Sequence, residues 1–418
     1  MTSKRSTAGW PYLATFIALG MSLSLLGPAL TFLRGRAHAS TGEIGVLFIA
    51  QSLGYLLGSL ASGRLYDGGA GHRGVAAGLL GIAAASLVIP HVSSVALLSI
   101  PVAFVGLFAA CIDVGGNTLV VWHSRRTGSV RLLNGLHLFF GVGALLVPGL
   151  VNRSLAWSNG LTLVTTVIAV YAVLVAILVL AHETPTPSTP EGSAPNAPQT
   201  PTRILAVIGV FFFLYVGVEI GFSGWITTYA EGIRLPGANA PTWLNTVFWS
   251  SFTLGRLLAV VLAKHVRSGQ MLAASCSLTV GLLAVMAVGN GSPAMVWVTT
   301  PLIGIAVAPQ FATMIAYAEE RITLSGRATS WFVSSSGLGG LALPFLIGQL
   351  LDGSSGAMPL TVLAAAGAAT AWLIVVRGVL DRAAADPEAG SGGGVEERGR
   401  LAAAVHGDVG PGDVAGHR

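Results

Sequence analysis

Long apolar runs follow one another along most of this chain, with only short polar connections between them. Reading each run up to the charged, Gly or Pro residues that bound it gives twelve segments of about 20 residues, the length at which an α-helix crosses a bilayer. The pattern therefore predicts an all-α membrane protein with twelve transmembrane helices. The expected spans are Trp10–Leu33, Gly42–Gly63, Arg73–Pro90, Val95–Trp122, Leu132–Val151, Asn159–Ala181, Arg203–Ala230, Thr242–Ala263, Met271–Val288, Ala294–Ala318, Thr329–Leu351 and Met358–Leu380.

The longest polar interruption divides these spans into two sets of six. Residues 183–202 hold six prolines among Thr, Ser, Ala and Gln, a composition typical of an extended, solvated linker. Residues 381–418 are rich in Gly, Ala and acidic residues, which is typical of a disordered tail. We expect an N-terminal six-helix bundle over residues 1–182, a Pro-rich cytoplasmic linker over 183–202, a C-terminal six-helix bundle over 203–380 and a disordered cytoplasmic tail over 381–418.

Two sequence matches relate the halves to each other. Leu53–Leu57 in the second span matches Leu254–Leu258 in the eighth, and Gly141–Pro148 in the fifth span matches Gly337–Pro344 in the eleventh. The matching glycines lie 201 residues apart in the first case (54 to 255) and 196 in the second (141 to 337). Two matches at nearly one offset indicate a parallel repeat, so the two bundles should be pseudo-symmetric.

Composition and charge agree with a membrane protein. The chain is 53% hydrophobic and 9% charged, whereas soluble domains carry about 25% charged residues. With the amino terminus in the cytoplasm, four of the 22 Lys and Arg residues lie outside and the other 18 inside, as the positive-inside rule requires. The expected location is the cytoplasmic (inner) membrane, with both termini cytoplasmic. A nucleic-acid partner is excluded because no soluble face gathers basic residues. The four outer residues are Arg34, Arg36, Arg153 and Arg234.

Nothing in the sequence indicates metal or enzymatic chemistry. Cys111 and Cys276 both lie inside apolar runs, without the spacing of metal ligands. No zinc-protease, Walker or nucleophile-elbow motif occurs, and the histidines are scattered singly. We expect neither a cofactor nor a metal, and no enzyme. The first span lacks a small-residue cleavage site, which favours a membrane helix over a removed signal peptide.

Three sets of residues resemble motifs of a known transporter family. The loop Gly63–Arg73 resembles the cytoplasmic Gly/Asp/basic motif of the major facilitator superfamily, with one extra residue and Gly68 in place of the usual base. Asp113 and Asn117 in span four are similar to the acidic-x-x-x-Asn signature of fucose-permease-like sugar symporters. With Leu26–Leu30 and Leu214–Glu219, the chain looks closest to the sodium-dependent glucose transporter-like subgroup.

The resemblance implies a fold, an activity and a gate. It implies two bundles that rock about a central site and move a small polar solute, most readily a sugar, by alternating access. It also implies a charge network of Asp67, Arg73 and Arg256 at the cytoplasmic ends of spans two and eight, which would hold the inward gate closed. Snorkelling and topology signals explain Arg256 nearly as well.

Asp113 is the leading candidate for coupling. A charged carboxylate at bilayer depth costs about 2.5 kcal/mol or more, so an intramembrane acid is a functional hypothesis by default. Asn117 lies one helical turn later on the same face. In the functional interpretation Asp113 alternates between protonated and ligand-bound states. In the structural one it is a permanently neutral acid, hydrogen-bonded to Asn117 or His137.

Glu219 in span seven is the second intramembrane acid. Flanking glycines weaken a helix, so the sequence favours a broken helix and a binding role; a structural, backbone-bonded acid is the alternative. Trp225 and Tyr229 share a helix face and suit stacking on a sugar ring, although Tyr229 fits an interfacial aromatic belt equally well. Glu219 lies about 120° from them on an ideal helix, so the three share a site only if the glycines bend it.

Three further polar residues lie within spans. His137 could relay a proton near a buried acid or simply bond a carbonyl. Gln51 and Gln310 are amides in mid-span, suited either to the hydroxyls of a ligand or to interhelical hydrogen bonds.

These features predict a monomeric, cation-coupled transporter whose partners are a small-molecule substrate and the lipid bilayer. A proton carried by Asp113 is the preferred coupling ion, and sodium stays open as the other choice. One alternative within transport is a proton-driven exporter of drugs or metabolites, with a wide apolar cavity lined by Phe211–Phe213. An alternative of another class is a membrane receptor or enzyme. The sequence shows neither the soluble module expected of a receptor nor the catalytic motif expected of an enzyme.

Overall fold

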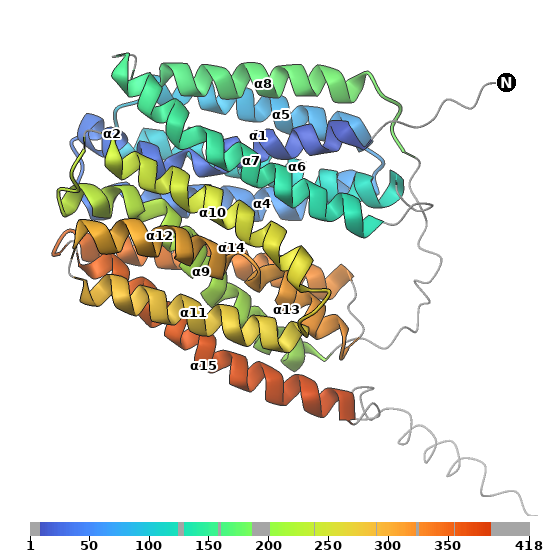
Figure 1. The fold of residues 1–418 in the computed structure, drawn as a ribbon. Coiled ribbons are helices and arrows are strands. Elements are labelled where there is room, and N and C mark those ends of the chain that lie inside the picture. Colours follow the sequence, from blue (N-terminus) through green and yellow to red (C-terminus); the bar gives the residue numbers. More distant parts are fainter. Residues whose placement is uncertain are drawn as a thin grey trace, which may run out of the picture.

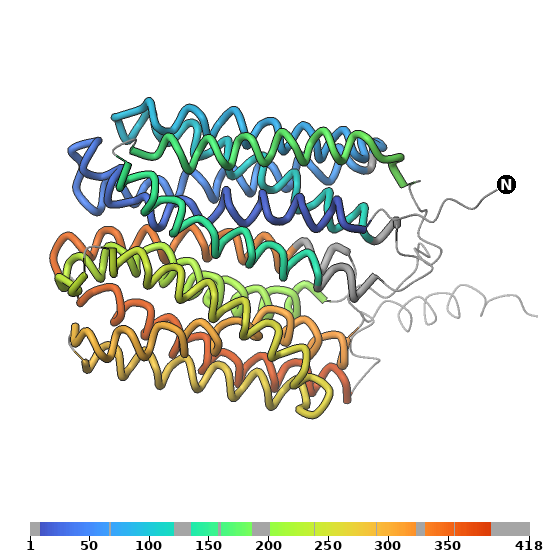
Figure 2. Tube along the Cα trace, turned by 45° about the horizontal axis from the view of Figure 1, so that its top comes forward, coloured from blue at the N-terminus to red at the C-terminus, as the bar shows by residue number. Residues whose placement is uncertain are grey.

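Helices form all the regular structure in the described part of the chain. The computed structural model describes residues 9–123, 129–157, 160–185, 201–237, 239–289, 291–322, 326–354 and 356–385. The helices lie roughly side by side in two layers, the first half of the chain in one and the second half in the other (Figure 1). The two halves are also seen as separate groups of helices in the turned view of Figure 2. Most of the linker (186–200) and tail (386–418) predictions lie outside the described residues.

The first half contains α1 to α8 and the second α9 to α15. The bounds in the first half are α1 Trp10–Ser24, α2 Leu26–Ala37, α3 Thr41–Ile44, α4 Val46–Asp67, α5 Gly71–Val88, the 3-10 helix η1 Ile89–His91, α6 Val95–His123, α7 Ser129–Ala156 and α8 Thr162–Leu180. Those in the second half are α9 Thr202–Gly232, α10 Ala240–Leu262, α11 Ser268–Val288, α12 Pro293–Val307, α13 Gln310–Glu319, α14 Gly326–Leu351 and α15 Ala357–Ala385.

These elements make 12 helices long and apolar enough to cross a membrane within the described residues, which confirms the predicted fold class. Four of these spans combine two elements, among them Trp10–Ala37 and Pro293–Glu319. Both of these are interrupted next to a proline. Pro28 lacks the N–H that would bond the Ser24 carbonyl, and Pro309 falls between α12 and α13.

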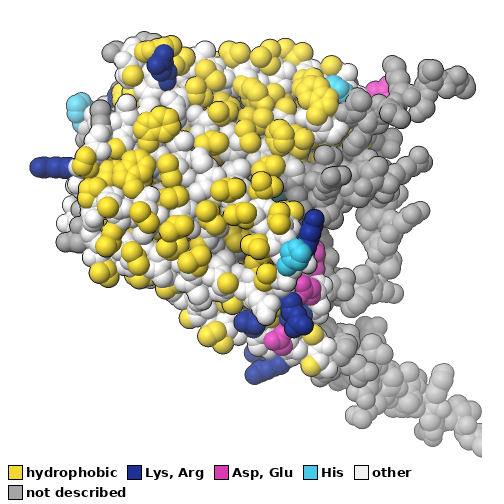
Figure 3. All heavy atoms as spheres, viewed as in Figure 1, with side chains coloured by type: hydrophobic (Ala, Val, Ile, Leu, Met, Phe, Trp, Pro, Cys, Tyr) yellow, Lys and Arg dark blue, Asp and Glu magenta, His cyan; other side chains and the backbone are white. Residues whose placement is uncertain are grey.

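The outer surface suits a lipid environment. Large hydrophobic side chains such as Leu57, Leu174 and Ile374 are exposed along the helices. On the face shown in Figure 3, hydrophobic side chains cover the middle of the molecule and charged ones gather toward its ends. A helix satisfies its own backbone hydrogen bonds, so such a surface can face hydrocarbon. The chain is therefore a multi-pass membrane protein.

Equivalent glycines make equivalent contacts in the two halves. A Cβ on Gly54 of α4 would collide with the Ala103 backbone of α6, and one on Gly255 of α10 would meet the Ile305 backbone of α12. Likewise, a Cβ on Gly143 of α7 would strike the Ile17 carbonyl of α1, and one on Gly339 of α14 the Phe213 carbonyl of α9. Small residues let membrane helices approach this closely. The matched sequences therefore occupy matched places.

The two ends of the molecule need names. We call the end at which α1 begins, α8 ends and α9 begins the linker end, on the right in Figure 1. The opposite end, where α2 and α9 finish, is the far end.

A clasp of hydrogen bonds joins the halves at the far end. The Asp352 carboxylate, just after α14, accepts the backbone N–H groups of Thr41 (2.7 Å) and Gly42 (2.8 Å) at the start of α3. The Gln349 side-chain amide donates to the Gly42 carbonyl over 2.8 Å. The far-end clasp therefore ties α14 of the second half to α3 of the first.

Two expectations need correction. Helix α9 runs unbroken from Thr202 to Gly232, so the break expected around Glu219 is absent. Its glycines serve close packing instead: a Cβ on Gly217 would lie 3.1 Å from Leu343 of α14. The tail expected to be disordered from 381 is helical up to Ala385, and Asp381 there accepts a hydrogen bond from Arg321 at 2.8 Å.

Candidate functional site

The first candidate group surrounds Asp113 on α6, in the first half. The Tyr55 hydroxyl, on α4, donates to Asp113 Oδ2. The Asn117 amide donates to Asp113 Oδ1 and to the Asp113 carbonyl, each over 2.9 Å. Asp113 and Asn117 share a helix face as their spacing predicts, and both are partly exposed. The structure thus brings two sequence-predicted residues together and adds Tyr55.

Both described donors to this carboxylate, Tyr55 and Asn117, are neutral. Among the residues that the structure describes, both ion pairs involve Arg321, far along the chain from Asp113. The Asp113 group can therefore accept hydrogen bonds, bind a proton or approach a polar solute, and no cation among the described side chains forms an ion pair with it.

The second group surrounds Glu219 on α9, in the second half. The Tyr215 hydroxyl, one turn earlier, donates to Glu219 Oε2 over 2.6 Å. Arg256 on α10 lies near enough for its charge to act on both this hydroxyl and the Glu219 carboxylate. Tyr215 and Glu219 are buried, and Arg256 is partly exposed. Each half therefore pairs a carboxylate with a tyrosine, and among the described residues the second pair also has a cation beside it.

Arg256 has different neighbours from the Asp67 and Arg73 of the expected gate. Its guanidinium sits over the Phe252 ring, 4.7 Å from the centroid, and Nη1 donates to the His137 carbonyl of α7 at 3.4 Å. Of the other two residues of the expected gate, Arg73 is exposed near the start of α5, and the Asp67 side chain lies outside the described residues. Arg256 thus belongs with Glu219 and with the interface between the halves.

His137 is exposed, and its ring packs edge-on against Phe16 of α1 at a centroid distance of 5.9 Å. The described hydrogen bond between His137 and Arg256 involves the His137 carbonyl, not its imidazole ring. Asp113 takes its described hydrogen bonds from Tyr55 and Asn117. The structure does not bring His137 into that set.

Trp225 and Tyr229 lie buried in this conformation. The indole N–H of Trp225 donates to the Pro344 carbonyl at 2.7 Å, and its ring packs against Phe48 of the first half at 5.5 Å. Because α9 is not bent, neither aromatic residue joins Glu219. Both pack toward the far end, where Trp225 helps to join the halves.

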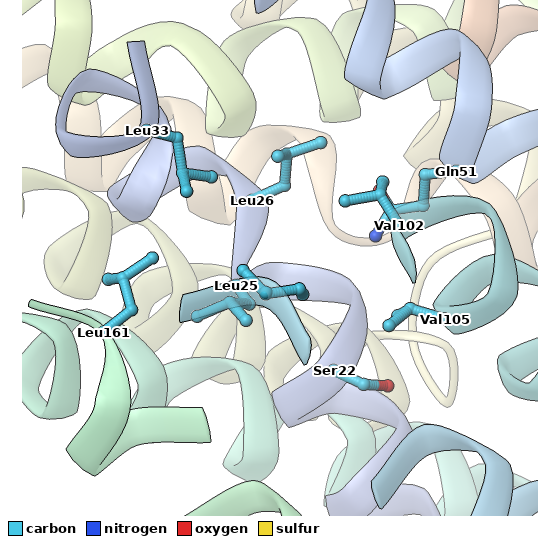
Figure 4. Close-up of a pocket in the computed structure, with 9 residues that line it drawn as sticks. Ser22, Leu25, Leu26, Leu33, Gln51, Val102, Val105 and Leu161 are labelled. Atoms are coloured by element: carbon cyan, nitrogen blue, oxygen red, sulfur yellow. The ribbon is translucent and has the colours of Figure 1, made fainter. Parts of the chain in front are cut away.

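The two candidate amides have different surroundings. Gln310 is buried and donates to Thr279 (3.0 Å) and to the Ala306 carbonyl (3.3 Å), so it forms an interhelical hydrogen bond. Gln51 lines a small, mostly apolar cavity of about 20 Å³ inside the first half (Figure 4). That volume holds about one water, too little for a sugar. The cavity is lined by Ser22, Leu25, Leu26, Leu33, Gln51, Ile89, Val102, Val105 and Leu161.

Sequence reasoning missed Tyr55, Tyr215 and Asp352. Tyr215 could have been found, since it precedes Glu219 by four residues and so faces it on a helix. Tyr55 lies in the repeated segment, at the position equivalent to Arg256 of the second half. Nothing in the sequence pattern shows that its side chain points toward Asp113. Asp352 follows the last apolar residue of its span and looks like an ordinary end of a helix.

Comparison with known proteins identifies the family. The sequence profile of the Major Facilitator Superfamily matches residues 12–344. This range covers most of the chain and both candidate groups. The chain belongs to the major facilitator superfamily.

Curated relatives and solved structures agree with this membership. Sodium-dependent glucose transporter 1A of Mus musculus is 26% identical over 399 residues, covering 85% of this chain and 92% of that protein. Sodium-dependent glucose transporter 1 of Homo sapiens is 24% identical, covering 86% and 76%. The Escherichia coli fucose:proton symporter FucP shares the fold at a TM-score of 0.61 and 16% identity, covering 88% of this chain and 98% of that one. This major facilitator superfamily member is a transporter of small molecules embedded in a membrane.

Proposed function

We propose that this transporter carries a sugar across the cytoplasmic membrane together with a proton, by alternating access. The Asp113 group supports the coupling: a carboxylate at membrane depth, held by Tyr55 and Asn117 and in contact with no described cation. The names of the curated relatives, sodium-dependent glucose transporters, support the sugar. Because an unpaired charge is costly at this depth, the carboxylate favours carrying a proton while the site is closed to water.

The donors around Asp113 favour a proton over sodium. Hard cations are bound by several oxygen ligands. Here Asp113 Oδ2 receives the Tyr55 hydroxyl and Oδ1 receives the Asn117 amide nitrogen. Turning the Asn117 amide over would place its oxygen against the Asp113 carbonyl and carboxylate, both acceptors. The group therefore presents donors where a sodium ion needs oxygens, whereas a proton needs only one carboxylate oxygen.

Alternating access follows from the division into halves. The far-end clasp joins the halves at one end, and the Arg256–His137 hydrogen bond joins them nearer the linker end. Each contact has to break when its side opens. Because both halves belong to one chain and meet within it, we propose a monomeric carrier.

The orientation rests on the charges. We propose that the linker end is cytoplasmic, together with both termini, and that the far end faces outward. Arg34 and Arg36 lie at the far end of α2, whereas Lys264, Arg267 and Arg321 lie at the linker end of the second half. With most basic residues on the linker side, the positive-inside rule gives this orientation.

Purified protein in liposomes tests the proposal. Uptake of radiolabelled D-glucose and L-fucose is measured under an imposed proton gradient, an imposed sodium gradient or neither. We expect accumulation of one of these sugars under the proton gradient in wild type and in Asp381→Asn, an exposed acid-to-amide control, and its loss in Asp113→Asn. Accumulation under sodium alone would overturn proton coupling, and no response to either sugar would overturn the sugar assignment.

A further inference from the structure

A line of polar side chains leads from the core of the second half to the interface between the halves. Tyr215 is fully buried and Glu219 is 8% exposed. Arg256 follows and is partly exposed, and His137, in the other half, is exposed. The guanidinium also reaches the first half, where its Nη1 donates to the His137 carbonyl. This arrangement fixes one charged donor group at the interface.

The orientation of Arg256 is set from two sides. The Tyr215 hydroxyl donates to Glu219 at 2.6 Å, and the Arg256 charge acts on both groups, so the buried Tyr215–Glu219 pair attracts the guanidinium from one side. The Phe252 ring, on the same helix, supports the flat face of the guanidinium at 4.7 Å. A planar cation held between a buried carboxylate and an aromatic ring loses little freedom when it binds a ligand.

The Arg256 guanidinium has more N–H donors than its described contacts use. It carries five N–H groups, and one of its described acceptors, the His137 carbonyl, lies 3.4 Å away, beyond the usual 2.7–3.2 Å range. A hydroxyl oxygen that approached to ordinary distance would be the better acceptor. A sugar offers several such hydroxyls, and each can accept from the guanidinium while it donates to a neighbouring carbonyl or carboxylate.

We propose that Arg256, positioned by Tyr215 and Glu219, is the hydroxyl-binding residue that the second half contributes to the sugar site, and that a sugar hydroxyl replaces the His137 carbonyl as its acceptor. This deepens the proposed function and rests on it. Arg256 binds the solute, whereas Tyr215 and Glu219 act through it as positioning residues. Because the displaced acceptor belongs to the first half, sugar binding at this point loosens one contact between α7 and α10. Occupancy and rocking of the halves are thereby linked.

The two acids then have different roles. Glu219 keeps a cation beside it and serves to orient that cation. The described donors to Asp113 are neutral, and it serves to carry the proton. Replacing Arg256 should therefore weaken sugar binding without abolishing coupling to the proton gradient, which is the opposite of the expectation for Asp113→Asn.

A series of monodeoxy-D-glucoses tests the assignment. Their affinities are measured by inhibition of radiolabelled D-glucose exchange in liposomes, which needs no ion gradient. In wild type, we expect one of these analogues to bind about tenfold more weakly than D-glucose, because it lacks the hydroxyl that Arg256 binds. In Arg256→Gln, D-glucose itself should weaken about tenfold, and that analogue should weaken no further. The matched control is Arg153→Gln, which removes an arginine stacked on Trp157 at 4.6 Å.

Unchanged discrimination among the analogues in Arg256→Gln would overturn the proposal, as would an equal loss in the Arg153→Gln control. If Arg256→Gln does not fold, Arg256→Lys and the double variant Arg256→Gln with Glu219→Gln replace it, since neither leaves a buried carboxylate without its cation. Both should show the weakened discrimination. The failures are distinguishable: a wild-type protein that exchanges neither D-glucose nor L-fucose contradicts the proposed function, whereas one that exchanges a sugar without any dependence on Arg256 contradicts only this inference.

Discussion

The far-end clasp sets how readily the far end opens, and Asp352 is its central residue. Its two carboxylate oxygens accept the Thr41 and Gly42 amides at 2.7 and 2.8 Å. Desolvation raises the pKa of the Asp352 carboxyl, but these hydrogen bonds lower it by more, so its pKa lies below the ordinary 3.8. The carboxylate is therefore ionised in both the joined and the separated state at pH 5–8, and its contribution is lost only as the pH falls through the lowered pKa.

The size of the effect follows from these bonds. A hydrogen bond to a charged group contributes about 1.5–3 kcal/mol, but Asp352 is exposed, and contacts between exposed charged groups are worth far less. We take about 1–2 kcal/mol for the pair. Asp352→Ala should then shift the equilibrium toward the open far end by about 5- to 30-fold. Asp352→Asn should have a smaller effect, because its amide oxygen still accepts one N–H.

Spin labels on Ser93→Cys and Ala294→Cys, both exposed at the far end of opposite halves, report this equilibrium as a distance distribution. The native Cys111 and Cys276 are buried. We expect Asp352→Ala to enlarge the long-distance population by the factor above at pH 7, and the wild-type distribution to stay constant between pH 5 and 8. Glu43→Gln is the control, because the described hydrogen bond of the Glu43 carboxylate is to the Ser40 N–H of its own half. An unchanged distribution in Asp352→Ala, or the same shift in Glu43→Gln, would refute the reasoning.

Two further predictions concern packing and surface charge. Gly339→Val should abolish recovery of monodisperse protein on size-exclusion chromatography, because any Cβ there collides with the Phe213 carbonyl. Gly337→Ala, with nothing within 4 Å, should behave as wild type. Normal recovery of Gly339→Val would show that α9 and α14 are not packed in this way. Asp381→Asn should lower the thermal unfolding midpoint by less than about 2 °C, because its ion pair with Arg321 is exposed and such pairs contribute about 0–1 kcal/mol; a fall of 5 °C or more would contradict this.

The fold could be predicted because it depends on features that the sequence shows directly. The length and apolar character of each run set the number of spans, and the Pro-rich stretch after the sixth separates the halves. The matched glycines indicated the repeat, and the contacts of Gly143 and Gly339 with equivalent helices explain why both positions hold glycine. None of these features depends on how a helix is rotated about its axis.

The partners of the site residues do depend on that rotation. A helix that is apolar all round, such as α9, gives little sign of which face meets which neighbour. Tyr55 reaches Asp113 from another helix, and Arg256 reaches past its own span toward Glu219 and His137. The glycines of α9 looked like a break by propensity, but Gly217 and Gly221 sit against Leu343 and Ile347 of α14, so tertiary packing overrides propensity there.

The central claim is that Asp113 carries the proton that drives sugar uptake. Its most direct test is the proton movement that the sugar itself induces, followed with a pH-sensitive dye in liposomes without any imposed gradient. Addition of the transported sugar should bring protons into wild-type liposomes, and a potential of 100 mV should then support about 50-fold accumulation, since one charge gains about 2.3 kcal/mol. In Asp113→Asn, sugar exchange should persist with no proton movement. Sugar-induced proton uptake of wild-type size in that variant would contradict the account.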